Sequence, residues 1–366
     1  MKKALIWAYT QVNLGDDLFI KILCERYPNT LFSIIGKKSK LIPFENIPNL
    51  QIIRDYYSSI DSGFRRLGCR SSFYNNKIKK NARNNDVVIN LGGSIFMEFN
   101  DWQKNLNDYK GVIENSSKFI VLGSNFGPYK SDDFLLNYSE VFNRLDDICF
   151  RDKKSYGLFK DLTNVRYAPD IVFGLAANKV QTLDDSDEYI LISVMDFSLR
   201  QKLSSYQKLY EKNIVKICSF LVSKKKKVKL MSFCKEEGDE RMIDRIRKTF
   251  GESPFISSYN YRGDIEEALA VIKSASSIVA TRFHSMILAL VFQKPFYPII
   301  YSEKMTNVLE DIRFKGKYSM LSEPIDCEEL YDQLKTLLPS FESNCNSNQF
   351  LYLDSILLEE GKFEVK

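Results

Sequence analysis

Apolar runs separated by amphipathic stretches occupy most of the first half of the chain, and several of these runs are apolar at consecutive positions. Consecutive apolar residues are typical of strands covered on both faces of a parallel sheet. The first half is therefore predicted to be an α/β domain. We expect its strands at Ala4–Tyr9, Leu31–Ile35, Asp86–Leu91, Lys118–Leu122, Asp147–Phe150 and Val165–Tyr167, with a first helix at Leu18–Arg26.

A second series of strands and helices follows a polar stretch at Asn178–Asp187, which is typical of a linker. Residues 1–178 and 179–366 are thus predicted to form two Rossmann-like, doubly wound domains, with C-terminal helices that could pack back on the first domain. The expected strands are Tyr189–Val194, Val228–Ser232, Phe255–Ser257, Ser277–Ala280 and Phe296–Ile300. The expected helices are Ser204–Val222, Asp239–Phe250, Asp264–Ser274, Glu303–Arg313, Cys327–Leu338 and Gln349–Glu360.

The composition is that of an ordinary globular chain and narrows the choice of partners. The chain has 366 residues, and 52 Lys and Arg against 47 Asp and Glu leave a net charge of +5, which gives no argument for nucleic acid. Seven scattered cysteines without a C-x-x-C pair suggest neither disulfides nor zinc. No window approaches the roughly 20 apolar residues that cross a bilayer. We expect a cytoplasmic protein that needs no metal or other cofactor.

Polar residues and glycines follow the strands of the first half directly. Ligands of open α/β sheets bind beyond the carboxyl ends of the strands, so these positions are candidates for binding. Asn13 and Asp16 can project into such a crevice, although this aspartate or the next one equally suits a helix N-cap. Gly93 with Ser94, and Asn125 after the following strand, are further candidates, but a plain turn explains the glycine equally well. No third glycine completes G-x-G-x-x-G, which disfavours a dinucleotide site.

In the second half, a strand at Ser277–Ala280 runs through an arginine and the chain's single histidine into an apolar helix. Arg282 and His284 are two residues apart at a strand end, so their side chains could converge on one group. The backbone N–H groups around Ser285 would be free at the helix start and could bind the same anion. A structural role for the histidine is the alternative.

Two further basic residues, Arg151 and Lys304, each follow an expected strand. Arg151 could grip an anion, with a surface pair between Arg151 and Asp152 as the alternative. Lys304 could add positive charge to the site of Arg282, or it could be an ordinary surface lysine.

Residues 54–85 carry a local charge excess of about six positive charges, with aromatic residues between the basic ones. This mixture suits an anionic membrane surface or the diphosphate of a lipid-linked sugar. A solvated loop is the alternative, and nucleic acid is conceivable for this stretch although we expect no nucleic-acid partner. Peripheral contact here would place the protein at the inner face of the cytoplasmic membrane.

Seven short motifs follow one another along residues 1–315. In this order they resemble the polysaccharide pyruvyl transferase family, although none is specific by itself. The motifs are N-x-G-D at Asn13–Asp16, Gly92-Gly93, G-x-x-x-G-P at Gly123–Pro128, R-D-x-x-S at Arg151–Ser155, Pro169-Asp170, R-x-H-S at Arg282–Ser285 and Y-x-x-K at Tyr301–Lys304.

The resemblance implies a GT-B-like fold and transfer of the enolpyruvyl unit of phosphoenolpyruvate to a sugar as a pyruvate ketal. The sugar would belong to a bacterial surface polysaccharide, such as a capsule or exopolysaccharide, or to its lipid-linked precursor. The arginines and the histidine of R-x-H are associated with phosphoenolpyruvate in the family; by motif these are Arg151, Arg282 and His284. Ser285 and Lys304 would complete the donor site in the second domain.

The first domain would bind the acceptor. Asp16 is the candidate for activating its hydroxyl, and His284 would act as an acid or only as a donor to the phosphate. The acceptor-binding residues are expected to be Asn13, Asp16, Gly93, Ser94 and Asn125. Ser94 stands where the family usually has a third glycine, and Ser124-Asn125 replace a Gln-containing pair, so the resemblance constrains the donor more closely than the acceptor.

Two other functions stay open at this point. A GT-B glycosyltransferase would use the arginines to grip the diphosphate of a nucleotide sugar. A non-catalytic sugar-binding protein could keep the same fold. Phosphate release from phosphoenolpyruvate would separate both from a pyruvyl transferase.

Overall fold

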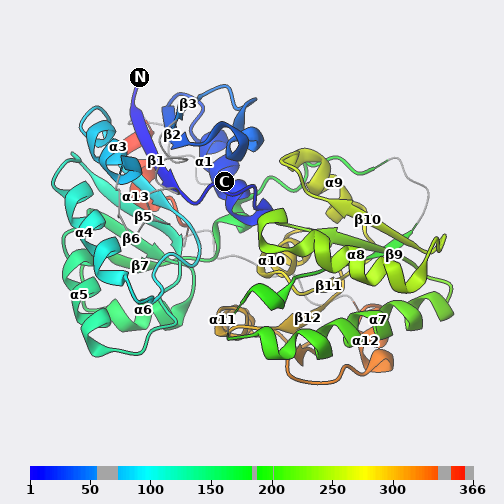
Figure 1. Ribbon diagram of the computed structural model, residues 1–366. Helices are drawn as coiled ribbons and strands as arrows, with labels where there is room; N and C mark the ends of the chain where they lie inside the picture. Colours follow the sequence, from blue (N-terminus) through cyan, green and yellow to red (C-terminus); the bar gives the residue numbers. More distant parts are fainter. Residues whose placement is uncertain (56–72, 184–187, 201, 337–347, 359–366) are drawn as a thin grey trace. The chain divides into compact units, whose positions relative to one another are not determined.

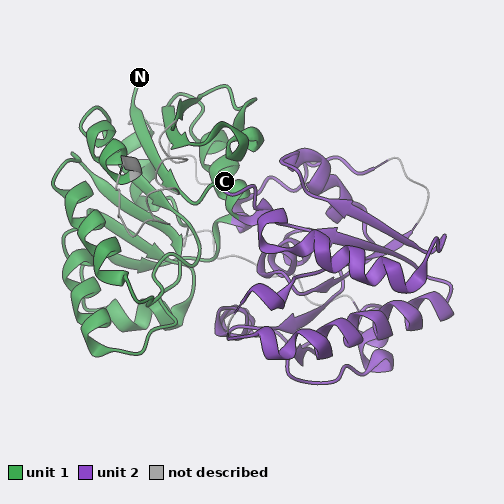
Figure 2. Cartoon of the chain, viewed as in Figure 1, with its two compact units in different colours: residues 1–10, 16–171, 343–366 green, residues 11–15, 172–342 purple. Residues whose placement is uncertain are grey.

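The computed structural model describes residues 1–55, 73–183, 188–200, 202–336 and 348–358 (Figure 1). The chain divides into two compact units (Figure 2). Unit 1 comprises residues 1–10, 16–171 and 343–366, and unit 2 comprises residues 11–15 and 172–342. We expected the division between residues 178 and 179, whereas the units divide between Ile171 and Val172.

Unit 1 is built on a seven-stranded parallel sheet with the order β3-β2-β1-β4-β5-β6-β7. The order reverses at β1, so the loops after β1 and β4 lie at a topological switch point. The strands are β1 (Lys3–Ala8), β2 (Leu31–Gly36), β3 (Leu50–Arg54), β4 (Val87–Leu91), β5 (Phe119–Ser124), β6 (Asp147–Phe150) and β7 (Val165–Tyr167). The helices are α1 (Leu14–Arg26), α3 (Phe73–Ala82), α4 (Trp102–Ile113), α5 (Asp132–Phe142), α6 (Lys153–Phe159) and α13 (Leu351–Leu357), with short 3-10 turns at Lys38–Lys40, Ile42–Phe44 and Ile171–Gly174.

Aromatic side chains fill the core on one face of this sheet. Phe96 packs edge-on against Phe142 at 4.8 Å between ring centroids, and Phe126 packs edge-on against Phe159 at the same distance. Tyr109 of α4 donates a hydrogen bond to Asn90 of β4. Because edge-to-face pairs add to the burial of apolar area, this cluster fixes α4, α5 and α6 against the strands.

The last described helix, α13, belongs to unit 1. Arg26 of α1 donates two hydrogen bonds, at 2.9 and 2.7 Å, to the carboxylate of Asp354, and the hydroxyl of Tyr27 donates a third at 2.6 Å. Just before the helix, the side chain of Gln349 accepts from the backbone N–H of Gly123 at 2.9 Å. Residues more than 300 positions apart in the sequence are thereby held together.

Unit 2 is built on a six-stranded parallel sheet with the order β10-β9-β8-β11-β12-β13. Here the order reverses between β8 and β11, which places the next switch point after these two strands. The strands are β8 (Tyr189–Ser193), β9 (Lys227–Ser232), β10 (Ile256–Asn260), β11 (Ser277–Ala280), β12 (Phe296–Ile300) and β13 (Ser319–Met320). The helices are α7 (Gln207–Ser223), α8 (Asp239–Phe250), α9 (Ile265–Ser274), α10 (Phe283–Val291), α11 (Glu303–Asp311) and α12 (Cys327–Gln333), with 3-10 turns η4 (Phe197–Leu199), η5 (Ser204–Tyr206) and η6 (Lys235–Glu237).

The predicted class, two doubly wound α/β sheets, is confirmed. The helix expected from residue 18 begins at Leu14, because Asn13 caps it: its Oδ1 accepts from the N–H of Gly15 at 3.2 Å, so neither aspartate of the first turn is the N-cap. The sequence pattern missed β3 and β13, which are edge strands. The expected helices at 327–338 and 349–360 are shorter in the described residues, at Cys327–Gln333 and Leu351–Leu357.

The described part of the expected linker is anchored rather than isolated. The ammonium of Lys273 in α9 donates to the carbonyls of Ala177 at 2.9 Å and Val180 at 2.6 Å. The N–H of Leu183 donates to the hydroxyl of Ser274 at 2.8 Å. Residues 184–187 of this stretch lie outside the described residues.

Replacing Asp354 by Ala should weaken the attachment of α13 and lower the stability of unit 1 by about 2 kcal/mol. The buried hydroxyl of Tyr27 and the guanidinium of Arg26 would lose their charged acceptor. Denaturant unfolding followed by hydrogen exchange in unit 1 measures this loss. Asp332→Ala, at an exposed aspartate, is the matched control and should change stability by less than about 0.5 kcal/mol; equal effects of the two variants would contradict the prediction.

Candidate anion-binding site

The switch point of unit 2 is occupied by Arg282, which follows β11 and is the N-cap of α10. The hydroxyl of Ser193, at the end of β8, accepts from the backbone N–H groups of Thr281 at 3.0 Å and Arg282 at 3.2 Å. These bonds tie the ends of the two central strands together. They hold the backbone of Arg282 where ligands of doubly wound sheets bind.

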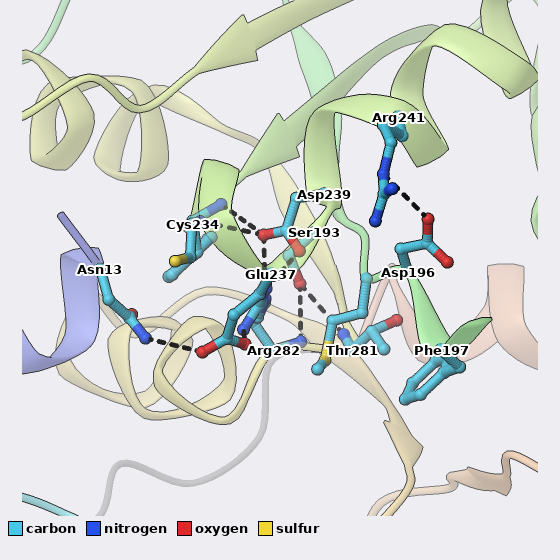
Figure 3. Close-up of polar contacts among 12 residues, drawn as sticks. Asn13, Ser193, Asp196, Phe197, Cys234, Glu237, Asp239, Arg241, Thr281 and Arg282 are labelled. Carbon is cyan, nitrogen blue, oxygen red and sulfur yellow. Dashed lines mark hydrogen bonds and ion pairs between the residues drawn. The ribbon is translucent and has the colours of Figure 1, made fainter. Parts of the chain in front are cut away.

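The guanidinium of Arg282 is paired with two carboxylates (Figure 3). Its Nε and Nη2 donate to the two oxygens of Asp239, the first at 3.0 Å, and its Nη1 donates to Glu237. Asp239 is fully buried and also accepts the N–H groups of Phe233 and Cys234 at 2.9 and 3.0 Å. Burial would lower the pKa of Arg282, but the two carboxylates raise it well above its usual value. The guanidinium is therefore charged, and Asp239 fixes its direction.

Glu237 joins Arg282 to a second arginine. Its Oε2 also accepts from Arg200 at 2.5 Å. Its Oε1 accepts from the amide of Asn13 at 3.4 Å (Figure 3). Burial alone would raise the pKa of this carboxyl, but Arg282, Arg200 and Lys304 lower it to about 2. Glu237 is consequently an anion throughout the neutral range, and its side chain keeps 22% of its surface exposed.

The N-termini of α10 and α11 lie at the carboxyl ends of the adjacent parallel strands β11 and β12. Helix N-termini carry a partial positive charge and usually attract acidic residues and capping side chains. Neither N-cap residue, Arg282 or Ser302, makes a capping hydrogen bond. The first turn of α10 has no acidic residue, whereas that of α11 contains the exposed Glu303. The buried hydroxyl oxygens of Ser285 and Ser302 make no hydrogen bond within the described part of the chain. Free donors and positive potential thus coincide at this edge.

Lys304, in the first turn of α11, adds to this positive charge. Its Nζ lies 5.4 Å from the ring centre of Phe283, the first residue of α10, and 5.6 Å from that of Tyr301. The lysine therefore reaches from one helix N-terminus toward the other. Together with Arg200 and Arg282 it gives three cations against the carboxylates of Glu237 and Asp239, an excess of one positive charge.

The imidazole of His284 packs against the backbone of Gly15. A Cβ atom on this glycine would lie 1.8 Å from Nδ1 of the histidine, so no other residue fits at position 15 without moving the ring. The glycine of N-x-G-D is therefore needed for close approach rather than for a tight turn. Because β11 ends at Ala280 and α10 begins at Phe283, Arg282 and His284 do not alternate along a strand, and their side chains contact different partners.

The segment Gln11–Gly15 is part of unit 2, although it follows the first strand of unit 1. The N–H of Leu14 donates to the carbonyl of Phe233 at 3.1 Å, and Asn13 forms an isolated antiparallel bridge with Cys234. The structure thus places Asn13, which we expected on the acceptor side, beside Glu237.

In unit 1, Arg151 is buried and paired with Asp170 at 2.9 Å, not with the neighbouring Asp152 as in the surface pair considered from sequence. Its Nη2 donates to Oδ1 of Asn125 at 2.8 Å. A Cβ on Gly93 would lie 2.8 Å from the same nitrogen, so this glycine makes room for the guanidinium. Asp152 instead caps α6. Arg151 thereby braces the carboxyl ends of several strands.

The remaining candidates of unit 1 lie around this arginine or in α1. The hydroxyl of Ser94 donates to Oδ1 of Asn125 at 3.0 Å, so Gly93, Ser94, Asn125 and Arg151 are brought together. Asp16 lies half-buried in the first turn of α1. Of the expected donor residues, Arg282, His284, Ser285 and Lys304 lie in unit 2 and Arg151 in unit 1.

Three sequence expectations concern other parts of the chain. Most of the basic stretch 54–85 lies outside the described residues; within them, Lys79 pairs with Asp108 at 3.6 Å and Arg83 donates to Asn115 at 2.7 Å. Among the described residues, no helix has the length and apolar character of a membrane span. The same residues contain no group of three or more His, Cys, Asp or Glu side chains placed to hold a metal ion.

The family model of the polysaccharide pyruvyl transferases matches residues 13–303. The chain belongs to this family. The match includes Asn13, Arg151 and R-x-H-S, and it ends one residue before Lys304. No match was found among curated protein sequences.

Solved structures resemble this chain in fold. A UDP-N-acetylglucosamine 2-epimerase of Listeria monocytogenes has a TM-score of 0.61 at 10% identity, with 97% of this chain and 96% of the other covered. HepE of Anabaena, in complex with UDP and glucose, has a TM-score of 0.57 at 11% identity, with 91% and 89% covered. The 2-epimerase of Methanocaldococcus jannaschii has 0.56 at 12%, with 98% and 99% covered. At these identities the likeness shows a GT-B-like fold only.

The sequence pattern missed three charged residues of the site in unit 2. Arg200 follows β8, while Glu237 and Asp239 follow β9. All three could have been noticed as charges beyond strand ends, but their meeting depends on the strand order β9-β8-β11. That order is not visible in the local sequence.

Replacing Gly15 by Ala should displace the imidazole of His284 and destabilise unit 2 by about 1 to 3 kcal/mol, because the new methyl group overlaps the ring. His284 is the chain's only histidine, so a single imidazole NMR signal reports its position. That signal should shift in the variant. Gly157→Ala is the matched control: nothing lies within 4 Å of a Cβ there, and alanine in a helix should be neutral or stabilising. An unchanged imidazole signal in Gly15→Ala would contradict the geometry.

Acidification should lower the stability of the wild-type protein more than that of a Glu237→Gln variant. The folded-state pKa of Glu237, about 2, lies below its unfolded value near 4.5, so its stabilising charge is fully present above pH 4.5 and is lost as the pH falls toward 2. The difference corresponds to roughly 3 kcal/mol. Denaturant unfolding between pH 6 and pH 2 should show a steeper fall for the wild type than for the variant. Glu252→Gln, at an exposed carboxylate, should follow the wild-type curve; parallel curves for all three proteins would refute the pairing.

Proposed function

We propose that this chain transfers pyruvate from phosphoenolpyruvate to two hydroxyls of a sugar, forming a cyclic ketal on a bacterial surface polysaccharide or its lipid-linked precursor. The family match supports the reaction class. The observation that carries the choice of donor is the group of cations, uncapped helix N-termini and unbonded hydroxyls beyond β11 and β12.

The charge of the donor suits this group. Phosphoenolpyruvate carries a carboxylate and a phosphate, together about −2.5 to −3 at neutral pH. Arg200, Arg282 and Lys304 exceed the carboxylates of Glu237 and Asp239 by one positive charge, and the N-terminus of α10, with no acidic residue in its first turn, adds about half a charge. Binding therefore brings the local charge closer to balance.

Arg282 would meet the donor through one side of its guanidinium. Asp239 is fully buried and engages Nε and Nη2, so this side stays occupied. Glu237 engages Nη1 from a partly exposed position, so an anion can compete with it there. Lys304 and the hydroxyls of Ser285 and Ser302 would supply further donors, and His284 stays a candidate ligand of the phosphate.

The reaction needs no redox step and, in this proposal, no metal or other cofactor. A proton is added to the methylene carbon of phosphoenolpyruvate, a sugar hydroxyl attacks the neighbouring carbon, and phosphate leaves when a second hydroxyl closes the ring. Preorganised positive charge stabilises the phosphate as it departs. The roles of Asp16, Ser94 and Asn125 in acceptor binding stay predictions, and so does the role of Arg151 in donor binding. Membrane contact through residues 54–85 and a cytoplasmic location also stay predictions.

The proposal is tested by incubating the purified protein with phosphoenolpyruvate, EDTA and a panel of free and lipid-linked oligosaccharides. Release of inorganic phosphate together with the mass gain of one pyruvate ketal is expected for at least one acceptor. Transfer from a uridine or guanosine diphosphate sugar instead would identify a glycosyltransferase. Sugar binding without turnover of either donor would identify a non-catalytic protein.

Replacing Lys304 by Met should raise the KM for phosphoenolpyruvate about 10- to 100-fold, the effect of losing one charged contact worth about 1.5–3 kcal/mol. Lys304 is chosen for this test rather than Arg282, because removing the arginine would leave Asp239 as an unpaired buried charge. Steady-state phosphate release measures the change. Lys315→Met, at an exposed lysine, is the control and should keep the wild-type KM; an equal KM in both variants would remove Lys304 from the donor site.

A further inference from the structure

Tyr301 lies beside Arg200 and Lys304, two of the three cations at this edge of the sheet. It follows β12 directly and precedes Ser302, the N-cap of α11. Its ring packs against Phe197 with 5.6 Å between centroids, and the guanidinium carbon of Arg200 lies 5.8 Å from the ring centre. With Lys304 at 5.6 Å from the same centre, the tyrosine has cations from two separate elements around it.

The electrostatic surroundings of this phenol favour loss of its proton. Burial would raise the pKa of Tyr301, but Lys304, Arg200 and Arg282 together lower it below its usual value, against an opposing effect of Glu237. The charged groups that act on this pKa come from four elements: Lys304 from α11, Arg200 from the end of η4, Arg282 from the start of α10 and Glu237 from η6. A phenolate formed at this position is therefore stabilised by its neighbours.

The hydroxyl of Tyr301 also has no structural task within the described residues, where it makes no hydrogen bond. Tyr301 is partly buried, whereas two fully buried tyrosines use their hydroxyls to hold the fold. Tyr210 donates to Thr281 at 3.1 Å and Tyr297 shares a hydrogen bond of 2.6 Å with Ser319. The phenol of Tyr301 is thus available to a ligand bound at the ends of β11 and β12.

We propose that Tyr301 is the general acid of pyruvyl transfer and protonates the methylene carbon of phosphoenolpyruvate. This inference rests on the proposed function. The negative charge of the bound donor offsets the surrounding cations, so the phenol holds its proton when the donor arrives. Once the proton has moved, the same cations stabilise the phenolate. His284 is the alternative acid; Nδ1 of its ring lies against the backbone of Gly15, and the ring packs edge-on against Phe283.

Protons and bonds balance in this scheme. The O–H bond of Tyr301 breaks, and the electron pair of the carbon–carbon double bond forms the new C–H bond of the methyl group. The first sugar hydroxyl bonds to the adjacent carbon and returns its proton to the phenolate. The bond from that carbon to the phosphate oxygen then breaks, the second hydroxyl takes its place, and its proton leaves with hydrogen phosphate. Tyr301 ends the cycle protonated.

The direct test is Tyr301→Phe, which keeps the ring and its packing on Phe197 and removes only the hydroxyl. We expect kcat to fall by about 10² to 10⁴, the usual contribution of one acid–base group, with a change in the KM for phosphoenolpyruvate below about threefold. In the wild type, kcat/KM should decline at high pH with an apparent pKa below the ordinary tyrosine value, and this decline should be absent or shifted in the variant. The residual rate and its pH profile report proton transfer rather than folding.

Tyr297→Phe is the matched control, since it removes a hydroxyl that bonds only to Ser319, from the strand that ends just before Tyr301. It should keep the wild-type kcat even where it lowers the melting temperature. The assignment would be overturned if Tyr301→Phe kept the wild-type kcat, whether or not its KM rose. It would also be overturned if kcat/KM declined at high pH in the same way in the variant and in the wild type. These outcomes leave the proposed function intact; only a wild-type protein that fails to release phosphate from phosphoenolpyruvate with every acceptor would refute that function itself.

Discussion

The ion pair between Arg282 and Asp239 is the interaction on which the site of unit 2 depends. A buried guanidinium is costly unless its donors are satisfied, and here Asp239 satisfies two of them while two backbone N–H groups fix the carboxylate. The pair fixes the arginine at the switch point between β8 and β11. Glu237, which is partly exposed, completes the pairing and is the anion that a ligand would displace.

Parallel strands bring this chemistry together because their carboxyl ends share one edge of the sheet. Arg200 arrives from β8, Glu237 from β9, Arg282 from β11 and Lys304 from β12. The N-termini of α10 and α11 add positive potential at the same edge. A ligand with two anionic groups suits this arrangement better than one with a single charge, which connects the geometry with the family to which the chain belongs.

Much of the fold could be predicted from apolar runs, since the bounds of β6, β7, β11 and β12 follow directly from them. Short edge strands such as β13 lack that signal. The contacts of the site were harder to predict than the strands. The position of Arg282 beyond a strand end was predictable, but its partners follow β9, which lies two strands away in the sheet. Likewise, Arg151 after β6 pairs with Asp170 after β7 rather than with its neighbour in sequence. Asn13 caps α1 in place of the two aspartates of its first turn. Contacts set by strand order cannot be read from local pattern.

Calorimetric titration of the wild-type protein with phosphoenolpyruvate in EDTA, at several salt concentrations and with uridine diphosphate as competitor, tests the central claim most directly. The account predicts saturable binding that weakens as salt rises, because charge carries the affinity, and no displacement by the nucleotide. Absence of binding at millimolar phosphoenolpyruvate, or its displacement by uridine diphosphate, would contradict the account.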